Sequence, residues 1–155
     1  MNSQRLNQYF QEYSESHQNL INKKIHLFAV PLISFSLLGL LMAIPTPGWF
    51  FEGMDWSTPF VICALVFYFS FKSPRLNIVI ILFLAIQLLI LQILRPNLLI
   101  PCLLIFSISW VAQFYGHHIE GRKPAFFKDL FFLLIGPLWV LRYLKLLRAS
   151  SAIRI

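Results

Sequence analysis

The residues best suited to chemistry are four histidines and one glutamate, which gather near the two ends of an apolar chain. His117 and His118 stand in the sequence Gln113-Phe-Tyr-Gly-His-His-Ile-Glu120, and His17 and His26 precede the first apolar run. Imidazole is a good ligand for iron, zinc, copper and nickel, and two histidines with one carboxylate commonly hold ferrous iron for oxygen chemistry. The pattern therefore predicts a metal site, provided that the two segments meet in space.

Helical spacing indicates which of these side chains share a face. Gln113, His117 and Glu120 stand at i, i+4 and i+7, so they occupy one face if the helix continues through them. His118 points about 100° away from His117. Asn22 and His26 are also four residues apart, whereas His17 lies nine residues before His26, so a bend is needed to bring both inward.

Each residue also has a purely structural interpretation. An isolated histidine at a membrane edge is more often a hydrogen-bonded polar residue than a ligand. Glu120 is close enough in sequence to Arg122 and Lys123 for a simple ion pair. Asn22 and Gln113 can bridge helices by hydrogen bonds alone, as Gln87 and Gln92 are expected to do. Spacing alone therefore leaves metal binding and structural roles about equally open.

The composition is typical of a membrane protein. The 155 residues are 58% hydrophobic and 12% charged, whereas soluble domains carry about 25% charged residues. The net charge of +7 comes from bases at the ends of apolar runs, where they face lipid headgroups. The sequence has no basic stripe of the kind that indicates nucleic-acid binding. We expect one integral membrane domain over residues 1–155, and a homo-oligomer is compatible with it.

Four apolar runs approach the roughly 20 residues that a membrane-spanning helix needs. A short amphipathic helix, with Ser3 as its N-cap, is expected before them over residues 4–16. Pro31 is expected in the first turn of the first span, where a missing N–H costs little. The predicted fold is therefore all-α, a polytopic membrane helical bundle with spans over about residues 27–44, 57–71, 76–94 and 98–115.

The last apolar run, residues 130–141, is divided by Gly136-Pro137 and is short for a span. We therefore expect a kinked, re-entrant or interfacial C-terminal helix within residues 126–148. The alternative is a fifth span, which would place the four C-terminal bases on the outer side.

The distribution of basic residues predicts the topology. Lys and Arg concentrate before the first run, in the 72–75 turn and in the 121–128 segment, whereas the 45–57 loop has none. The positive-inside rule then places both termini on the cytoplasmic side of a bacterial inner membrane, or of the endoplasmic reticulum in a eukaryote. Four spans separate the two histidine segments, so both lie on that side and can meet.

Two blocks of sequence resemble a family of small membrane proteins, domain of unknown function 962, whose characterised member is a 2-hydroxy-fatty-acid dioxygenase. The first block extends from Tyr13 through His17 and His26 to Ile33. The second extends from Trp110 through Gly116-His117 to Ala125 and continues over residues 129–139. The blocks occur in the family's order, and the middle spans match only as apolar runs.

This resemblance implies an Fe2+-dependent enzyme in the lipid bilayer. It would use O2 to shorten a 2-hydroxy fatty acid by one carbon, the chemistry of fatty acid alpha-oxidation. By position, the family's iron ligands correspond to His17, His26 and His117, with His118 less secure. Glu120 corresponds to a further ligand or a supporting group. Asn22 and Gln113 correspond to orienting residues.

The carboxylate and hydroxyl of a 2-hydroxy acid can chelate one metal ion side by side. Arg122 or Lys123 is expected to pair either with that carboxylate or with a lipid headgroup. Two other functions compete with this one. The first is a non-catalytic lipid-binding or scaffold protein with structural histidines. The second is a transporter or channel, which the absence of charges within the spans and of paired broken helices disfavours.

Overall fold

The computed structural model describes residues 2–15, 17–121, 126–144 and 146–147. These residues form six helices and no strand, which confirms the all-α prediction. The helices are α1 (Asn2–Glu15), α2 (Leu20–Ala43), α3 (Ser57–Phe69), α4 (Pro74–Leu94), α5 (Leu99–Glu120) and α6 (Phe126–Tyr143).

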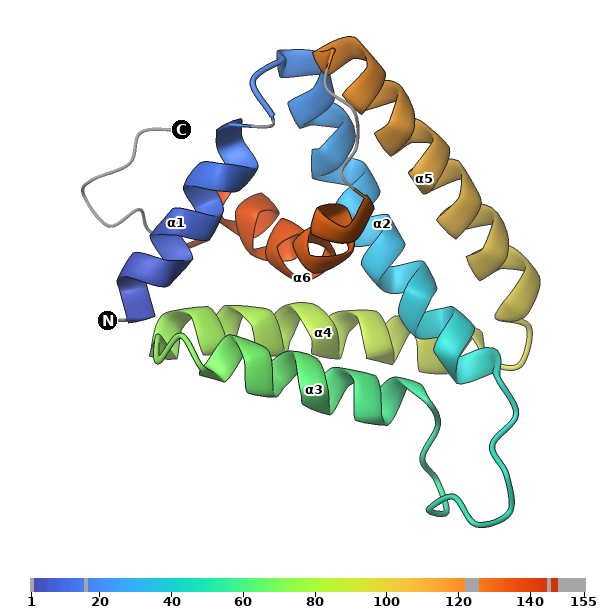
Figure 1. The fold of residues 1–155 in the computed structure, drawn as a ribbon. Helices are drawn as coiled ribbons and strands as arrows, with labels where there is room; N and C mark the ends of the chain where they lie inside the picture. Colours follow the sequence, from blue (N-terminus) through green and yellow to red (C-terminus); the bar gives the residue numbers. More distant parts are fainter. Residues whose placement is uncertain (1, 16, 122–125, 145, 148–155) are drawn as a thin grey trace.

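The helices are arranged as two antiparallel pairs around a central helix (Figure 1). α2 runs beside α5, α3 runs beside α4, and the pairs converge where α2 ends and α5 begins. α6 packs between α1 and α2, where Ile135, Leu138 and Trp139 are completely buried. Since α2 and α5 are antiparallel neighbours, the first turns of α2 lie beside the last turns of α5.

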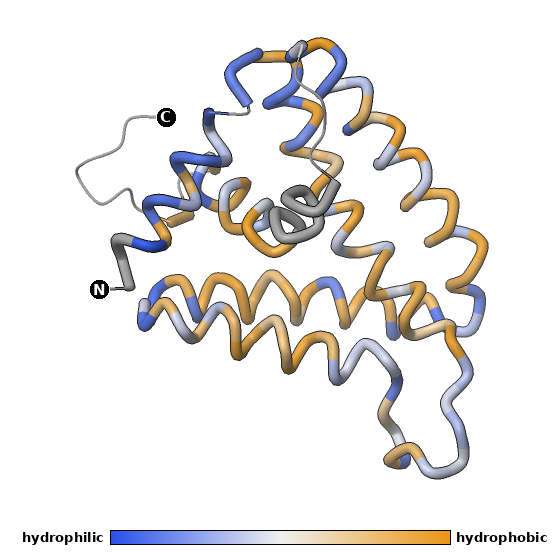
Figure 2. Tube along the Cα trace, viewed as in Figure 1, coloured by the Kyte–Doolittle hydropathy of each residue, from blue (hydrophilic) through white to orange (hydrophobic). Residues whose placement is uncertain are grey.

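Three helices, α2, α4 and α5, are long and apolar enough to cross a membrane. The second predicted span forms α3, whose 13 residues extend about 20 Å at about 1.5 Å per residue. A bilayer core is roughly 30 Å thick. Figure 2 shows that α2 to α5 consist mostly of hydrophobic residues, whereas α1 is mostly hydrophilic. The outer face of α5 exposes apolar side chains such as Ile100, Ile108 and Val111.

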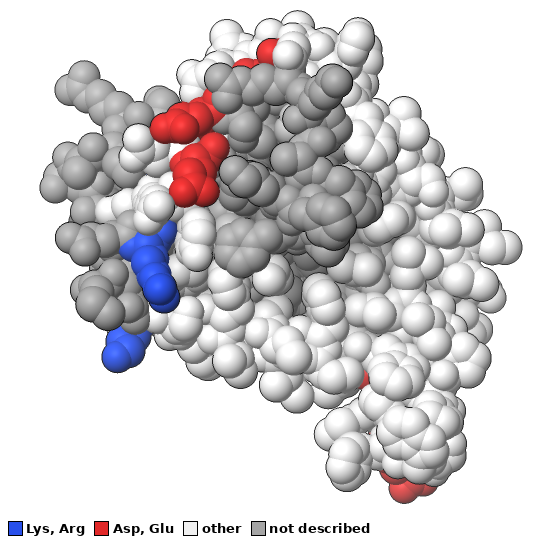
Figure 3. Space-filling model, viewed as in Figure 1, with Lys and Arg blue, Asp and Glu red and all other residues white. Residues whose placement is uncertain are grey.

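The charged surface agrees with membrane association. On the face shown in Figure 3, charged side chains lie on the α1 side, at the top where α2 begins and α5 ends, and at the loop after α2, and the described residues over the middle of α3 and α4 are uncharged. Arg95, in the turn between α4 and α5, pairs with Asp55, in the loop between α2 and α3. These two connections therefore lie at the same end of the molecule, opposite the start of α2.

The first long helix begins earlier than its hydropathy predicts. Asn19 caps α2, its side chain accepting a hydrogen bond from the Ile21 N–H at 2.8 Å. Asn22 and His26 are consequently helical residues. The prediction that Pro31 lies in the first turn is wrong, because the helix begins eleven residues before it. Ser3 is likewise inside α1, which begins at Asn2, so it is not the N-cap.

The C-terminal helix lies within the predicted range of residues 126–148, but it is not divided. α6 continues through Gly136 and Pro137, where the sequence suggested a division. A Cβ on Gly136 would lie 3.0 Å from Cγ1 of Val30, so the glycine allows α6 to lie close against α2. Whether α6 is re-entrant or interfacial stays a prediction.

Hydrogen bonds join the helices within the apolar region. Gln87 on α4 accepts a bond from Ser34 Oγ at 3.0 Å and donates to the Pro31 carbonyl at 3.4 Å. This confirms the helix-bridging role predicted for Gln87. The side chain of Gln92 is exposed instead.

Glycines set the close contact between α2 and α5. A Cβ on Gly39 would collide with Sγ of Cys102 and lie 2.9 Å from Cδ2 of Leu91. Near the other end of the pair, a Cβ on Gly116 would collide with Oδ1 of Asn22. Small residues at such contacts let helix backbones approach closely where lipid offers no hydrophobic driving force.

We expect Gly39→Ala to destabilise the protein by about 1–3 kcal/mol, the usual cost of overpacking a well-filled core. Thermal unfolding in detergent would measure the change. Gly48→Ala is the matched control, because nothing lies within 4 Å of a Cβ there. Adding Cys102→Ala to Gly39→Ala should recover part of the loss, and equal stability of both glycine variants would contradict the proposed contact.

Candidate metal centre

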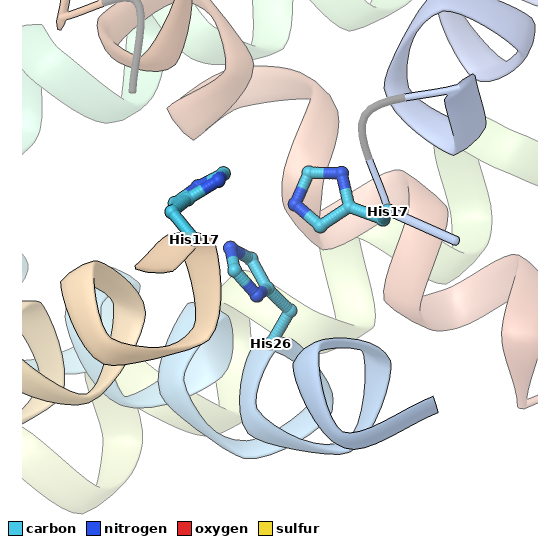
Figure 4. A group of neighbouring side chains, drawn as sticks. All are labelled: His17, His26 and His117. Carbon is cyan, nitrogen blue, oxygen red and sulfur yellow. The ribbon is translucent and has the colours of Figure 1, made fainter. Parts of the chain in front are cut away.

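Three histidines meet at the end of the molecule where α2 begins and α5 ends. Each of His17, His26 and His117 offers one ring nitrogen, and these atoms lie within 4.8 Å of one another. Their rings converge from three segments, the α1–α2 linker, α2 and α5 (Figure 4). Exposed fractions are only 2%, 2% and 7%. The predicted meeting of the two histidine segments is therefore confirmed.

Backbone carbonyls select the tautomer of two of these rings. His17 Nδ1 lies 2.7 Å from the Tyr13 carbonyl, and His26 Nδ1 lies 3.1 Å from the Asn22 carbonyl. A carbonyl can only accept a hydrogen bond, so each Nδ1 carries the proton and each Nε2 keeps its lone pair. Metal-binding histidines are commonly held in this way. The donor set therefore fits a metal ion that prefers imidazole.

The surroundings favour the neutral form of His17. Burial lowers its pKa from 6.5 to about 4, so the ring is uncharged at neutral pH. Tyr13 stacks on it at 4.1 Å between ring centroids, with planes 4° apart. Trp139 on α6 lies 6.0 Å from the same ring and donates from Nε1 to Ser14 Oγ at 3.2 Å. A metal ligand must be deprotonated, so this environment suits metal binding.

Asn22 and Gly116 explain how α2 and α5 bring His26 and His117 together. Asn22 is completely buried, and a Cβ on Gly116 would lie 3.3 Å from its Cγ. Any side chain at position 116 would push the helices apart beside the histidines. The sequence interpretation gave Gly116 no packing role, and it also missed Tyr13 and Trp139. The position of Tyr13, four residues before His17, was the available signal.

Glu120 lies outside the three-histidine group. Its Oε1 accepts hydrogen bonds from the N–H groups of Gln18 and Asn19, at 2.7 and 3.2 Å. Its Oε2 accepts from the Asn19 N–H at 3.0 Å and from Asn22 Nδ2 at 2.9 Å. Gly121 follows in the left-handed conformation, with φ of 71°, and ends α5. The last turn of α5 is thus joined to the linker that carries His17.

Other predicted site residues are less central. His118 is exposed on α5 and is not part of the histidine group. Gln113 is half-buried one turn before His117. Arg122 and Lys123, predicted to pair with Glu120 or with a substrate carboxylate, lie outside the described residues. Catalytic roles for Gln113, Asn22 and Glu120, and a ligand role for His118, therefore stay predictions.

Comparison with known proteins agrees with the resemblance seen in the sequence. The model of the family described as 2-hydroxy-palmitic acid dioxygenase Mpo1-like matches residues 3–146, nearly the whole chain. No curated protein and no solved structure matches the chain.

Metal analysis of purified variants tests the site. We expect close to one divalent ion per chain, and its loss in His117→Ala, because two imidazoles alone bind an ion weakly. His118→Ala is the matched control and should keep the ion, since its exposed ring lies outside the group. Equal metal loss in both variants would contradict this assignment.

Proposed function

The chain belongs to the Mpo1-like family, and from this premise we propose that it is a membrane-embedded Fe2+-dependent dioxygenase. It would use O2 to shorten 2-hydroxy fatty acids by one carbon. The observation that carries the proposal is the buried group of His17, His26 and His117 in a member of this family. Imidazole suits iron, and three such ligands leave positions open for other ligands.

The three imidazole donors indicate what a bound metal ion would contribute to the reaction. A bound ferrous ion would supply a site at which O2 is reduced and the hydroxyl and carboxylate of the substrate are held side by side. The protein's part is to present two neutral Nε2 atoms, because the Tyr13 and Asn22 carbonyls hold the Nδ1 protons. His118 is left out of the ligand set because its side chain is exposed.

Aromatic side chains also shield one side of the candidate centre from water. Tyr13 and Trp139 cover one side of His17, so bulk water does not reach that side. Gln113 is proposed to orient the head of the substrate from the turn of α5 that precedes His117. The acyl tail would lie against apolar helix surfaces, because the histidines lie where α2 and α5 leave the apolar region. A lipid could then present its polar head without leaving the membrane.

Oxygen consumption is the direct test. Chain purified without O2 and loaded with Fe2+ should consume O2 with 2-hydroxypalmitate and yield a fatty-acid product one carbon shorter. Palmitate lacks the chelating hydroxyl and serves as the substrate control. A chelator should abolish the reaction, and added Fe2+ should restore it. Full activity in chain shown to contain no iron would refute the proposal and favour a structural role for the histidines.

The same proposal places the metal centre and both termini on the cytoplasmic side. We expect a membrane-impermeant thiol reagent added from outside to label Gly48→Cys but not Gln11→Cys, each in a Cys63→Ala/Cys102→Ala background. Gly48 lies in the loop after α2 and Gln11 on the exposed face of α1, at opposite ends of α2. Labelling of both sites after membrane permeabilisation is the control, and the reverse pattern would invert the topology.

A further inference from the structure

We propose that Glu120 is the positioning residue of this centre: it clamps the linker that carries His17 onto the adjoining ends of α2 and α5. The inference rests on the proposed function, because it concerns the same three histidines. The sequence left two roles open for Glu120, iron ligand or supporting group, and the inference assigns it the second and names the segment that it supports.

The need for a clamp follows from where the three histidines stand. His26 and His117 belong to helices that pack directly against each other. His17 belongs to the short linker between the end of α1 and the start of α2. Linkers are less constrained than helices, and a metal site requires ligands held within a fraction of an ångström. A contact from the α2–α5 pair to this linker would therefore set the position of His17.

Glu120 makes that contact with both carboxylate oxygens. Four hydrogen bonds reach it, from the N–H groups of Gln18 and Asn19, the latter shared between both oxygens, and from the side-chain amide of Asn22. Bonds to an ionised acceptor are about twice as strong as bonds between neutral groups. The carboxylate also lies at the N-terminus of α2, where the helix dipole favours negative charge. Gln18 directly follows His17, so the clamp acts one residue from the ligand.

The same bonds argue against ligation by Glu120. An ionised carboxylate has about four lone-pair sites, and three N–H donors, one of them shared between both oxygens, already bond to Glu120. Binding a metal through Glu120 would break contacts to the linker and to buried Asn22. The carboxylate thus serves the structure around the metal site and leaves its open positions to other ligands.

Asn22 connects the clamp to a second ligand. Its side-chain amide donates to Glu120 Oε2 at 2.9 Å, and its backbone carbonyl accepts from His26 Nδ1 at 3.1 Å. Its Oδ1 lies against Gly116, directly before His117. Asn22 therefore contacts His26 and the segment of His117 directly, and it reaches the linker of His17 through Glu120. A change at Glu120 should reach the metal through the geometry of these histidines.

The test compares Glu120→Gln with Glu52→Gln, an exposed glutamate in the loop after α2. In Glu120→Gln we expect about 10–100-fold weaker metal binding, the usual effect of losing a group that supports a ligand. Backbone amides of the linker should exchange hydrogen faster, also in metal-free protein. X-ray absorption of the bound metal should still report three imidazoles. Glu52→Gln should match the unchanged protein in all three measurements.

A second variant distinguishes loss of the Glu120 hydrogen bonds from a general loss of structure. Asn22→Asp alone places two carboxylates together and should weaken metal binding and speed linker exchange. Combined with Glu120→Gln, the new amide can donate to the new carboxylate, so part of the metal affinity and exchange protection should return. Additive losses in the double variant would contradict the clamp.

Two further results would overturn the inference. Loss of an oxygen ligand in Glu120→Gln, with linker exchange unchanged, would make Glu120 a metal ligand. Unchanged exchange together with unchanged metal affinity would leave it without a positioning role. Because linker exchange is measured without metal, it tests the clamp even if the chain binds no iron. Failure of the proposed function and failure of the clamp are therefore distinguishable.

Discussion

The close approach of α2 and α5 is the constraint on which the rest of the molecule depends. Gly39 allows it at one end by leaving room for Cys102, and Gly116 allows it at the other by leaving room for Asn22. Between helices surrounded by lipid, packing and hydrogen bonds must provide the attraction that the hydrophobic effect provides in water. Because the two helices are in contact, His26 and His117 are neighbours although they lie 91 positions apart in sequence.

The end of this helix pair where α2 begins and α5 ends is polar, unlike the rest of the pair. Along most of the pair the outer surface is apolar, whereas where α2 begins and α5 ends buried polar groups are joined in a network. Asn22, Glu120 and the carbonyls of the preceding turns fill hydrogen-bonding positions around the histidines. Networks of this kind rigidify a site when their members are paired, and an unpaired member is costly. The candidate centre thus combines a rigid helix pair with a linker that is held to it.

Local patterns predicted much of the fold and missed some helix boundaries for identifiable reasons. Hydropathy identified α2, α4 and α5, because a helix in lipid must present apolar side chains. It placed the start of α2 too late, since the first turns of the helix include polar residues, of which Asn22 and His26 are buried against protein rather than lipid. The same error misplaced Pro31. The Gly136-Pro137 pair, interpreted as a helix breaker, suggested a division of the last apolar run, but α6 continues through it and the glycine serves the contact with Val30.

The sequence by itself determined the all-α class, the apolar character, the placement of both histidine segments at one end of the bundle, and the shared face of Gln113, His117 and Glu120. Hydropathy, helical periodicity and the expectation of an even number of spans between the two segments are enough for these conclusions. The resemblance to the family indicated His17, His26 and His117, with His118 less secure. Only the tertiary structure showed that these three rings meet while His118 is exposed, and that the partners of Glu120 are the linker amides and Asn22. Spacing defines faces within one helix, but distances between segments depend on how side chains far apart in sequence pack.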